Sequence, residues 1–136
     1  MTALEKLTAW LKTFPLWEPG DVSVDGLSPK PGSVGIYPQG IRELSRREDV
    51  LGNVEVTNRL TVTVCRVSAG ADAMWLLEFQ NWVNRQSAAG FAPKLGDRPE
   101  KERIRAEKGR LTAPNQTGTK RYAVEITADF VTQCIV

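Results

Sequence analysis

Hydrophobic residues recur at helical spacing near the start of the chain. The apolar face of residues 3–14 is formed by Leu4, Leu7, Leu11 and Phe14, with Trp10 beside it. Thr2 stands where an N-cap is expected, and Glu5 follows three residues later as in a capping box. Because Pro15 cannot continue a helix, the pattern predicts an amphipathic helix over 3–14.

A second helical pattern covers residues 71–89. Its wide apolar stripe consists of Trp75, Leu76, Phe79, Trp82 and Val83. Asp72 is placed to cap the start, and Gly90 stands where a C-terminal cap glycine is expected. A tryptophan-rich stripe of this kind is typical of a core helix that packs on a sheet.

Alternating patterns predict strands. In 54–67, Leu60, Val62 and Val64 fall on one face, and the threonines fall on the other. Residues 122–131 alternate in the same way and predict a final strand. Residues 33–37 are expected to form a short strand, bracketed by Gly32 and Pro38, and a further short strand is considered at Val22–Val24.

The polar residues 41–48 are expected to pair with 54–67 in a hairpin of about 41–67, joined by a turn at 49–53. The region of about 91–120 is read as a flexible loop region, in which EKERIRAEKGRL forms a strand or a partly ordered segment. These elements predict a single domain over 1–136. Its expected fold class is α+β: a mostly antiparallel sheet of about four strands with helices packed on one side.

Composition limits the chemistry that is expected. The 136 residues include no histidine, which removes the usual general base and the commonest metal ligand. The two cysteines, Cys65 and Cys134, form no CxxC pair and are read as buried apolar residues. No catalytic, cofactor-binding or metal site is therefore predicted, and the protein is not expected to be an enzyme. The absence of a long apolar run or a secretory signal predicts a soluble, cytosolically made protein without membrane contact.

The glycine-rich stretch KPGSVGIYPQG at 30–40 differs from a phosphate-binding loop. Such a loop lies between a buried strand and a helix, and its lysine follows the glycines. Here Lys30 precedes the glycines, and Pro38-Gln39-Gly40 follows in place of a helix. The stretch is therefore interpreted as turns around a strand.

Charged residues gather in two places. Within 41–49, opposite charges alternate, which indicates a solvated strand face or a face between subunits. Residues 94–110 contain seven basic and four acidic residues, which suggests phosphate contact, but no aromatic residue is interleaved as a stacking platform. The residues chosen as protein-interface candidates are Arg42, Arg46, Arg47, Glu48, Arg103 and Arg105.

Several motifs occur together in one order. After Trp82 come Pro93-Lys94-Leu95-Gly96-Asp97, then the Ile-x-Ala-x-x-Gly-x-Leu element at 104–111, then the alternating strand 122–131. Earlier in the chain, Lys30-Pro31-Gly32 leads into Ile36-Tyr37-Pro38. In this order the motifs resemble the phage minor capsid protein family of Gram-positive prophages, over most of residues 1–133.

That family is similar to phage tail terminators, which are small α+β proteins. The resemblance implies a structural virion protein that forms a homohexameric ring, caps the tail tube and offers a surface to the head connector. It implies the tail tube protein and a head completion or connector protein as partners, with DNA only as the genome passing through the ring lumen. It also implies a location at the head–tail interface, after assembly in the host bacterial cytoplasm, and no catalytic residues.

Two alternatives stay open at this point. The first is a nucleic-acid-binding module that uses the basic segment 94–110. The second is a carboxylate-dependent enzyme, which the sequence supports least.

Overall fold

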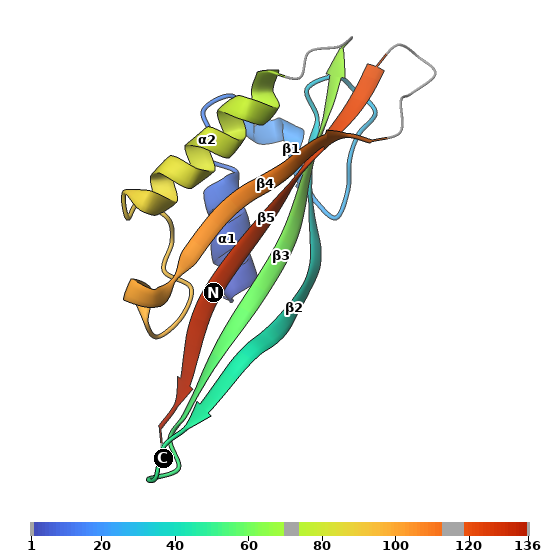
Figure 1. Cartoon of the computed structure of the whole chain (residues 1–136). Helices are drawn as coiled ribbons and strands as arrows, with labels where there is room; N and C mark the ends of the chain where they lie inside the picture. Colours follow the sequence, from blue (N-terminus) through green and yellow to red (C-terminus); the bar gives the residue numbers. More distant parts are fainter. Residues whose placement is uncertain (1, 70–73, 113–118, 136) are drawn as a thin grey trace.

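The computed structural model describes residues 2–69, 74–112 and 119–135 as an α+β fold built on one mixed sheet (Figure 1). The helices are α1 (Ala3–Leu11) and α2 (Met74–Ala88), with short 3-10 turns η1 (Pro19–Asp21) and η2 (Pro99–Lys101). The strands are β1 (Val22–Val24), β2 (Val34–Glu48), β3 (Val54–Ala69), β4 (Arg103–Leu111) and β5 (Thr119–Cys134). They lie in the order β1-β2-β3-β5-β4, so the sheet has five strands where about four were predicted.

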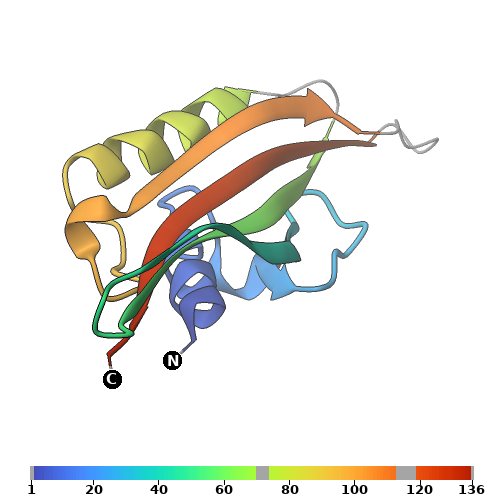
Figure 2. The same cartoon turned by 60° about the horizontal axis from the view of Figure 1, so that its bottom comes forward.

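The sheet is mostly antiparallel, as predicted. Only β1 runs parallel to its neighbour, pairing with the start of β2 at Val34–Ile36, and the other three pairings are antiparallel. Figures 1 and 2 show both helices on the same side of this twisted sheet. The core cluster lies between the two helices and one face of the sheet. That face carries Leu60, Val62 and Val64 from β3 and the even-numbered residues 122–130 from β5, which is the alternation that the sequence predicted.

Helix α1 is shorter than expected. Thr2 caps it as predicted, since its hydroxyl accepts a hydrogen bond from the Glu5 amide at 3.1 Å. The helix ends at Leu11, three residues before the predicted end, where the Trp17 indole donates to the Leu11 carbonyl at 2.9 Å. Phe14 lies past this end but still packs edge-on against Phe79, with ring centroids 5.0 Å apart.

Helix α2 packs against β4 and is fixed there by polar side chains. Trp75, Phe79 and Val83 are its buried residues, in agreement with the predicted stripe. The Asn84 side chain donates a hydrogen bond to the Ala106 carbonyl and accepts one from the Ala106 amide. The Ser87 hydroxyl accepts a hydrogen bond from the Ile104 amide at 3.2 Å. Gly90 ends the helix with a φ of 82°, as predicted, whereas the predicted cap Asp72 lies outside the described residues.

The predicted break between two strands at Pro38 was wrong. Residues 33–37 and 41–48 are not separate strands, because β2 runs through Pro38 without a break. Proline is tolerated there because β1 pairs only as far as Ile36, so Pro38 lies on a free edge that needs no N–H donor, next to a bulge. Within the predicted loop region 91–120, the segment that was expected to be a strand or partly ordered contains the strand β4, and residues 113–118 lie outside the described part.

Gly109 explains why β4 was difficult to recognise. Lys108 has a positive φ of 59°, and the pairing register with β5 shifts between Glu107 and Arg110. A Cβ on Gly109 would come within 2.5 Å of the Gln80 side-chain nitrogen of α2. The glycine of the Ile-x-Ala-x-x-Gly-x-Leu element therefore lets a bulged strand pass closely beneath the helix.

Candidate protein-interaction site

Strands β2 and β3 extend past the helices as a projecting hairpin, residues 41–59 (Figure 1). Every residue of β2 from Gln39 to Glu48 is exposed, although β2 and β3 stay paired up to Glu48 and Val54. The end of β5 runs beside β3 as far as the pair Cys134 and Val54, so the projection is a ribbon of three strands up to the turn. Large apolar side chains are exposed on and beside it: Ile41, Leu44, Val50, Leu51 and Ile135.

A tight turn closes this hairpin as the sequence predicted. Asp49 accepts hydrogen bonds from the amides of Leu51 and Asn53 at 2.8 and 3.0 Å and from the Asn53 side chain at 2.9 Å. These bonds, the one from the Asn53 side chain first, lower the pKa of the Asp49 carboxyl from its ordinary value. The turn is therefore well defined by local bonds even though none of it is covered by the rest of the described chain.

The outer edge of β2 is open along the hairpin. Among the described residues, no strand pairs with β2 on that side beyond Ile36. The outer edge of β4 differs, because Asn84 and Ser87 of α2 occupy the Ala106 and Ile104 amides. An open strand edge is a template for pairing with another chain. Along the projecting hairpin, the edge of β2 therefore offers main-chain bonds to a partner.

The six candidate interface residues divide between the two faces of the sheet. Pairing places Arg42, Arg59, Asp129 and Arg103 in one row across four strands, on the face away from the helices. Arg105 and Arg47 lie on this same face, in other rows. Arg46 and Glu48 point to the opposite face, where the Arg46 guanidinium binds Glu43 at 2.9 Å.

The face away from the helices is strongly basic, and we call it the basic face. It is held together by the Arg59–Asp129 pair, which makes two bonds of 2.8 and 2.9 Å. The register of β2–β5 places seven arginines there, namely Arg42, Arg47, Arg59, Arg103, Arg105, Arg110 and Arg121. It places four carboxylates on the same face, namely Glu55, Glu107, Glu125 and Asp129.

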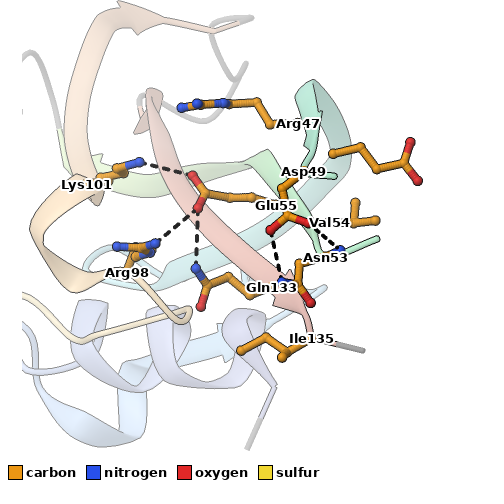
Figure 3. A pocket seen from close by; sticks show the side chains of 10 residues that line it. Arg47, Asp49, Asn53, Val54, Glu55, Arg98, Lys101, Gln133 and Ile135 are labelled. Carbon is orange, nitrogen blue, oxygen red and sulfur yellow. Dashed lines mark hydrogen bonds and ion pairs between the residues drawn. The ribbon is translucent and has the colours of Figure 1, made fainter. Parts of the chain in front are cut away.

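A hollow of about 410 Å³ opens on the basic face beside the hairpin turn (Figure 3). Glu55 of β3 lies in its centre, with the Lys101 ammonium at 3.0 Å and the Arg98 guanidinium at 3.5 Å. The hydrogen bond from Lys101 is the main cause that lowers the Glu55 pKa. Arg47 and Ile135 border the same hollow. The lining also includes Glu48 and Asp49, so its three cations are matched by three carboxylates and the hollow has no net charge.

The segment that carries Arg98 and Lys101 crosses the edge of β5 where β4 has not yet begun. The Asp97 amide donates to the Val131 carbonyl at 2.7 Å, and the Gln133 amide donates to the Asp97 carboxylate at 2.7 Å. A Cβ on Gly96 would overlap the Val131 carbonyl oxygen. The Glu102 carboxylate accepts from the Leu95 and Gly96 amides and holds the crossing in place.

Sequence reasoning missed Glu55 and Gln133 as members of this site. Arg98 and Lys101 were noted within the basic segment, but their partner lies 46 residues away from Lys101. A single sequence carries no signal for that pairing. The Leu-Gly-Asp motif could have indicated a close backbone approach at Gly96, but it could not have indicated that the contact is with β5.

Two main-chain donors at the start of the glycine-rich stretch 30–40 are occupied. The Gly32 amide donates to the Val67 carbonyl at 2.8 Å, and the Ser33 amide donates to the Lys30 carbonyl at 3.1 Å. Gly35 is buried, and a Cβ there would come within 2.6 Å of the Gly26 carbonyl oxygen. The glycines therefore serve close packing of the β1–β2 connection, as a turn reading requires, and they present no cradle for phosphate.

The described part of the chain offers little to other kinds of site. It contains no group of three or more His, Cys, Asp or Glu side chains arranged to hold a metal ion. Cys65 is buried as expected, and burial raises its pKa, whereas Cys134 is exposed, contrary to expectation. No helix within the described ranges is long and apolar enough to cross a membrane.

Neither a protein-family model nor a curated protein matches this chain.

Proposed function

We propose that this protein is a structural component of a phage virion, a tail terminator or head–tail joining protein. On this proposal it forms a homohexameric ring on the tail tube and offers a surface to the head completion or connector protein. It assembles in the host bacterial cytoplasm and acts at the head–tail interface. The motif order from Lys30 to Val131 supports this assignment, because it resembles the phage minor capsid protein family.

The projecting hairpin is the observation that carries the proposal. It exposes the apolar side chains of Ile41, Leu44, Val50 and Leu51 to water. Their burial therefore contributes little to the stability of the isolated chain. Apolar side chains exposed together on a strand ribbon that no helix covers are typical of an interaction surface, so this extension is best explained by a partner that covers it. Assembly into a ring supplies that partner from a neighbouring copy or from the tube.

The open edge of β2 fits a ring for a second reason. A ring needs a heterologous contact, in which one patch on each copy meets a different patch on the next. The β2 edge is open and the β4 edge is blocked by α2, so the two sides of the sheet are not equivalent. In a ring, the β2 edge of one copy would therefore meet a surface of the next copy other than its β4 edge.

The test is tube capping. Purified protein is mixed with tail tubes and imaged by negative stain, and its mass is measured by light scattering with and without tubes. The double reversal Arg46→Glu/Arg47→Glu, which lies on the projecting hairpin, is expected to impair ring formation and capping while the fold is retained.

The matched control is Lys12→Glu/Arg85→Glu, which makes the same charge change on exposed residues of the helix side. This control is expected to cap tubes like the wild-type protein. Wild-type protein that stays monomeric and never caps tubes would contradict the proposal. Equal capping by the Arg46/Arg47 variant would instead show that the hairpin is the wrong docking surface.

A further inference from the structure

The distribution of charge over the molecule is uneven. The formal net charge of the whole chain is only +2, yet the strand residues of the basic face comprise seven arginines and four carboxylates. Arg98 and Lys101 add two further cations at the hollow around Glu55. Glu48 and Asp49 line the same hollow, so seven plus two cations stand against four plus two carboxylates, and an anion that approaches this face still meets a positive field.

The basic face is also long, shallow and free of helices. Its central strands carry several small side chains, such as Thr61, Thr63, Ala123 and Thr127, while five of the seven arginines stand on the flanking strands β2 and β4. Thr127 is only 5% exposed because the Arg105 side chain lies across it, with a 3.3 Å bond to its hydroxyl. From Glu55 to Val67 the strand β3 spans about 40 Å at the usual rise per residue, which is about one turn of duplex DNA.

We propose that the basic face binds the phosphate backbone of double-stranded DNA. The proposal goes beyond the ring function and does not depend on it. It differs from a site on segment 94–110 alone, because Arg98, Lys101 and Lys108 of that segment are paired with Glu55 and Glu125. The cations that reach solvent come instead from different strands, as with Arg42 on β2, Arg103 on β4 and Arg121 on β5.

An acidic protein is the other polyanion to consider, and the face fits it less well. Protein interfaces have an apolar or aromatic centre, whereas protein–DNA interfaces are polar and much more positively charged. The exposed apolar residues Ile41 and Leu111 point to the opposite face of the sheet. Among the described strand residues, the basic face has a single aromatic side chain, that of Tyr37. Binding of a single strand relies on several aromatic side chains that stack on bases, so this face favours a duplex.

The experiment measures binding of the isolated protein to a fluorescent 30-bp duplex of arbitrary sequence by anisotropy, from 50 to 300 mM salt. We expect a dissociation constant of roughly 10⁻⁶ to 10⁻⁴ M near physiological salt and a steep loss of affinity as salt rises. The variant Arg42→Gln/Arg103→Gln/Arg105→Gln should bind roughly tenfold more weakly or worse at 100 mM salt. Its salt slope should be shallower by about 0.9 for each phosphate contact removed.

The matched control is Lys12→Gln/Arg85→Gln/Lys94→Gln, which removes the same charge from exposed residues outside the basic face. This control should keep the wild-type affinity and slope, and circular dichroism should show both variants folded. No binding by the wild-type protein at 50 mM salt would overturn the proposal, as would equal weakening by the two variants. Equally tight binding of polyglutamate would also overturn it and would identify an acidic protein as the partner. The binding assay contains no tail tube, so its outcome is independent of the outcome of the capping test.

Discussion

The two halves of the β2–β3 ribbon show how one sequence pattern serves two environments. In the half under the helices, Ile36 and Val64 face each other and are both fully buried. In the projecting hairpin, Ile41 lies on the same face of the same strand and is 61% exposed. The alternation is similar in both halves, so the pattern alone marks a strand but does not say whether its apolar face is covered within the chain. What differs is the presence of α1 and α2.

The largest expected contrast is between two identical truncations in β2. Ile36→Ala should lower the free energy of unfolding by about 2–5 kcal/mol, because it removes a fully buried side chain from the core. Ile41→Ala should change it by less than about 0.5 kcal/mol, because most of the side chain is already in water. Urea denaturation of both monomeric variants measures the difference. A cost for Ile41→Ala close to that of Ile36→Ala would show that the hairpin is covered in solution.

The crossing at Gly96 should give the next largest effect. In Gly96→Ala the new methyl group overlaps the Val131 carbonyl oxygen, so the crossing must shift, at about 1–3 kcal/mol. Gly20→Ala is the matched control, since no heavy atom lies within 4 Å of its Cβ position. Thermal unfolding compares the two variants. Equal stability would mean that the segment 95–97 moves away from β5 without cost.

Gly96 also shows where prediction from sequence stops. The helices, the alternating strands, the Thr2 and Gly90 caps and the turn at 49–53 could be predicted, because each depends on residues near one another in the chain. By contrast, the segment at Gly96 lies against Val131, and Lys101 pairs with Glu55. These contacts join residues tens of positions apart, and no local sequence pattern predicts them.

The errors have the same cause. Pro38 indicated the end of a strand, but the free edge beside it made a proline harmless, and edge position is a property of the whole sheet. Residues 103–111 showed too few apolar positions for a confident element, because one face of β4 meets α2 and the other is the charged basic face. Of the candidate site, the charged residues could be chosen from sequence, but their division between two faces required the bulges in β2 at Gln39 and Leu44.

Two arginine–carboxylate pairs extend the comparison of the covered sheet with the projecting hairpin, and the expected difference in free energy is smaller. Arg59 and Asp129 join β3 to β5 with side chains 24% and 21% exposed, whereas Arg46 and Glu43 lie on one strand and are 56% and 43% exposed. Solvent screens the second pair more strongly, so its coupling should be the smaller one. Double-mutant cycles with Arg59→Gln/Asp129→Asn and Arg46→Gln/Glu43→Gln measure both couplings. A larger coupling for Arg46 and Glu43 would contradict the difference in screening.

The smallest effect concerns the pH dependence of the hairpin turn. The pKa of Asp49 is lowered below its ordinary 3.8 by the hydrogen bonds from Asn53, Leu51 and Gly52. Because the folded form favours the charged carboxylate, its contribution is complete above the ordinary value and is lost as the pH falls through the lowered one. The Leu51 and Asn53 amide resonances should therefore shift in one NMR titration step with a midpoint below 3.8. In Asp49→Asn this step should vanish while the melting temperature stays unchanged, since the turn lies outside the core that α1 and α2 cover. A midpoint at or above 3.8 would show that the turn is open in solution and that order in the hairpin depends on a partner.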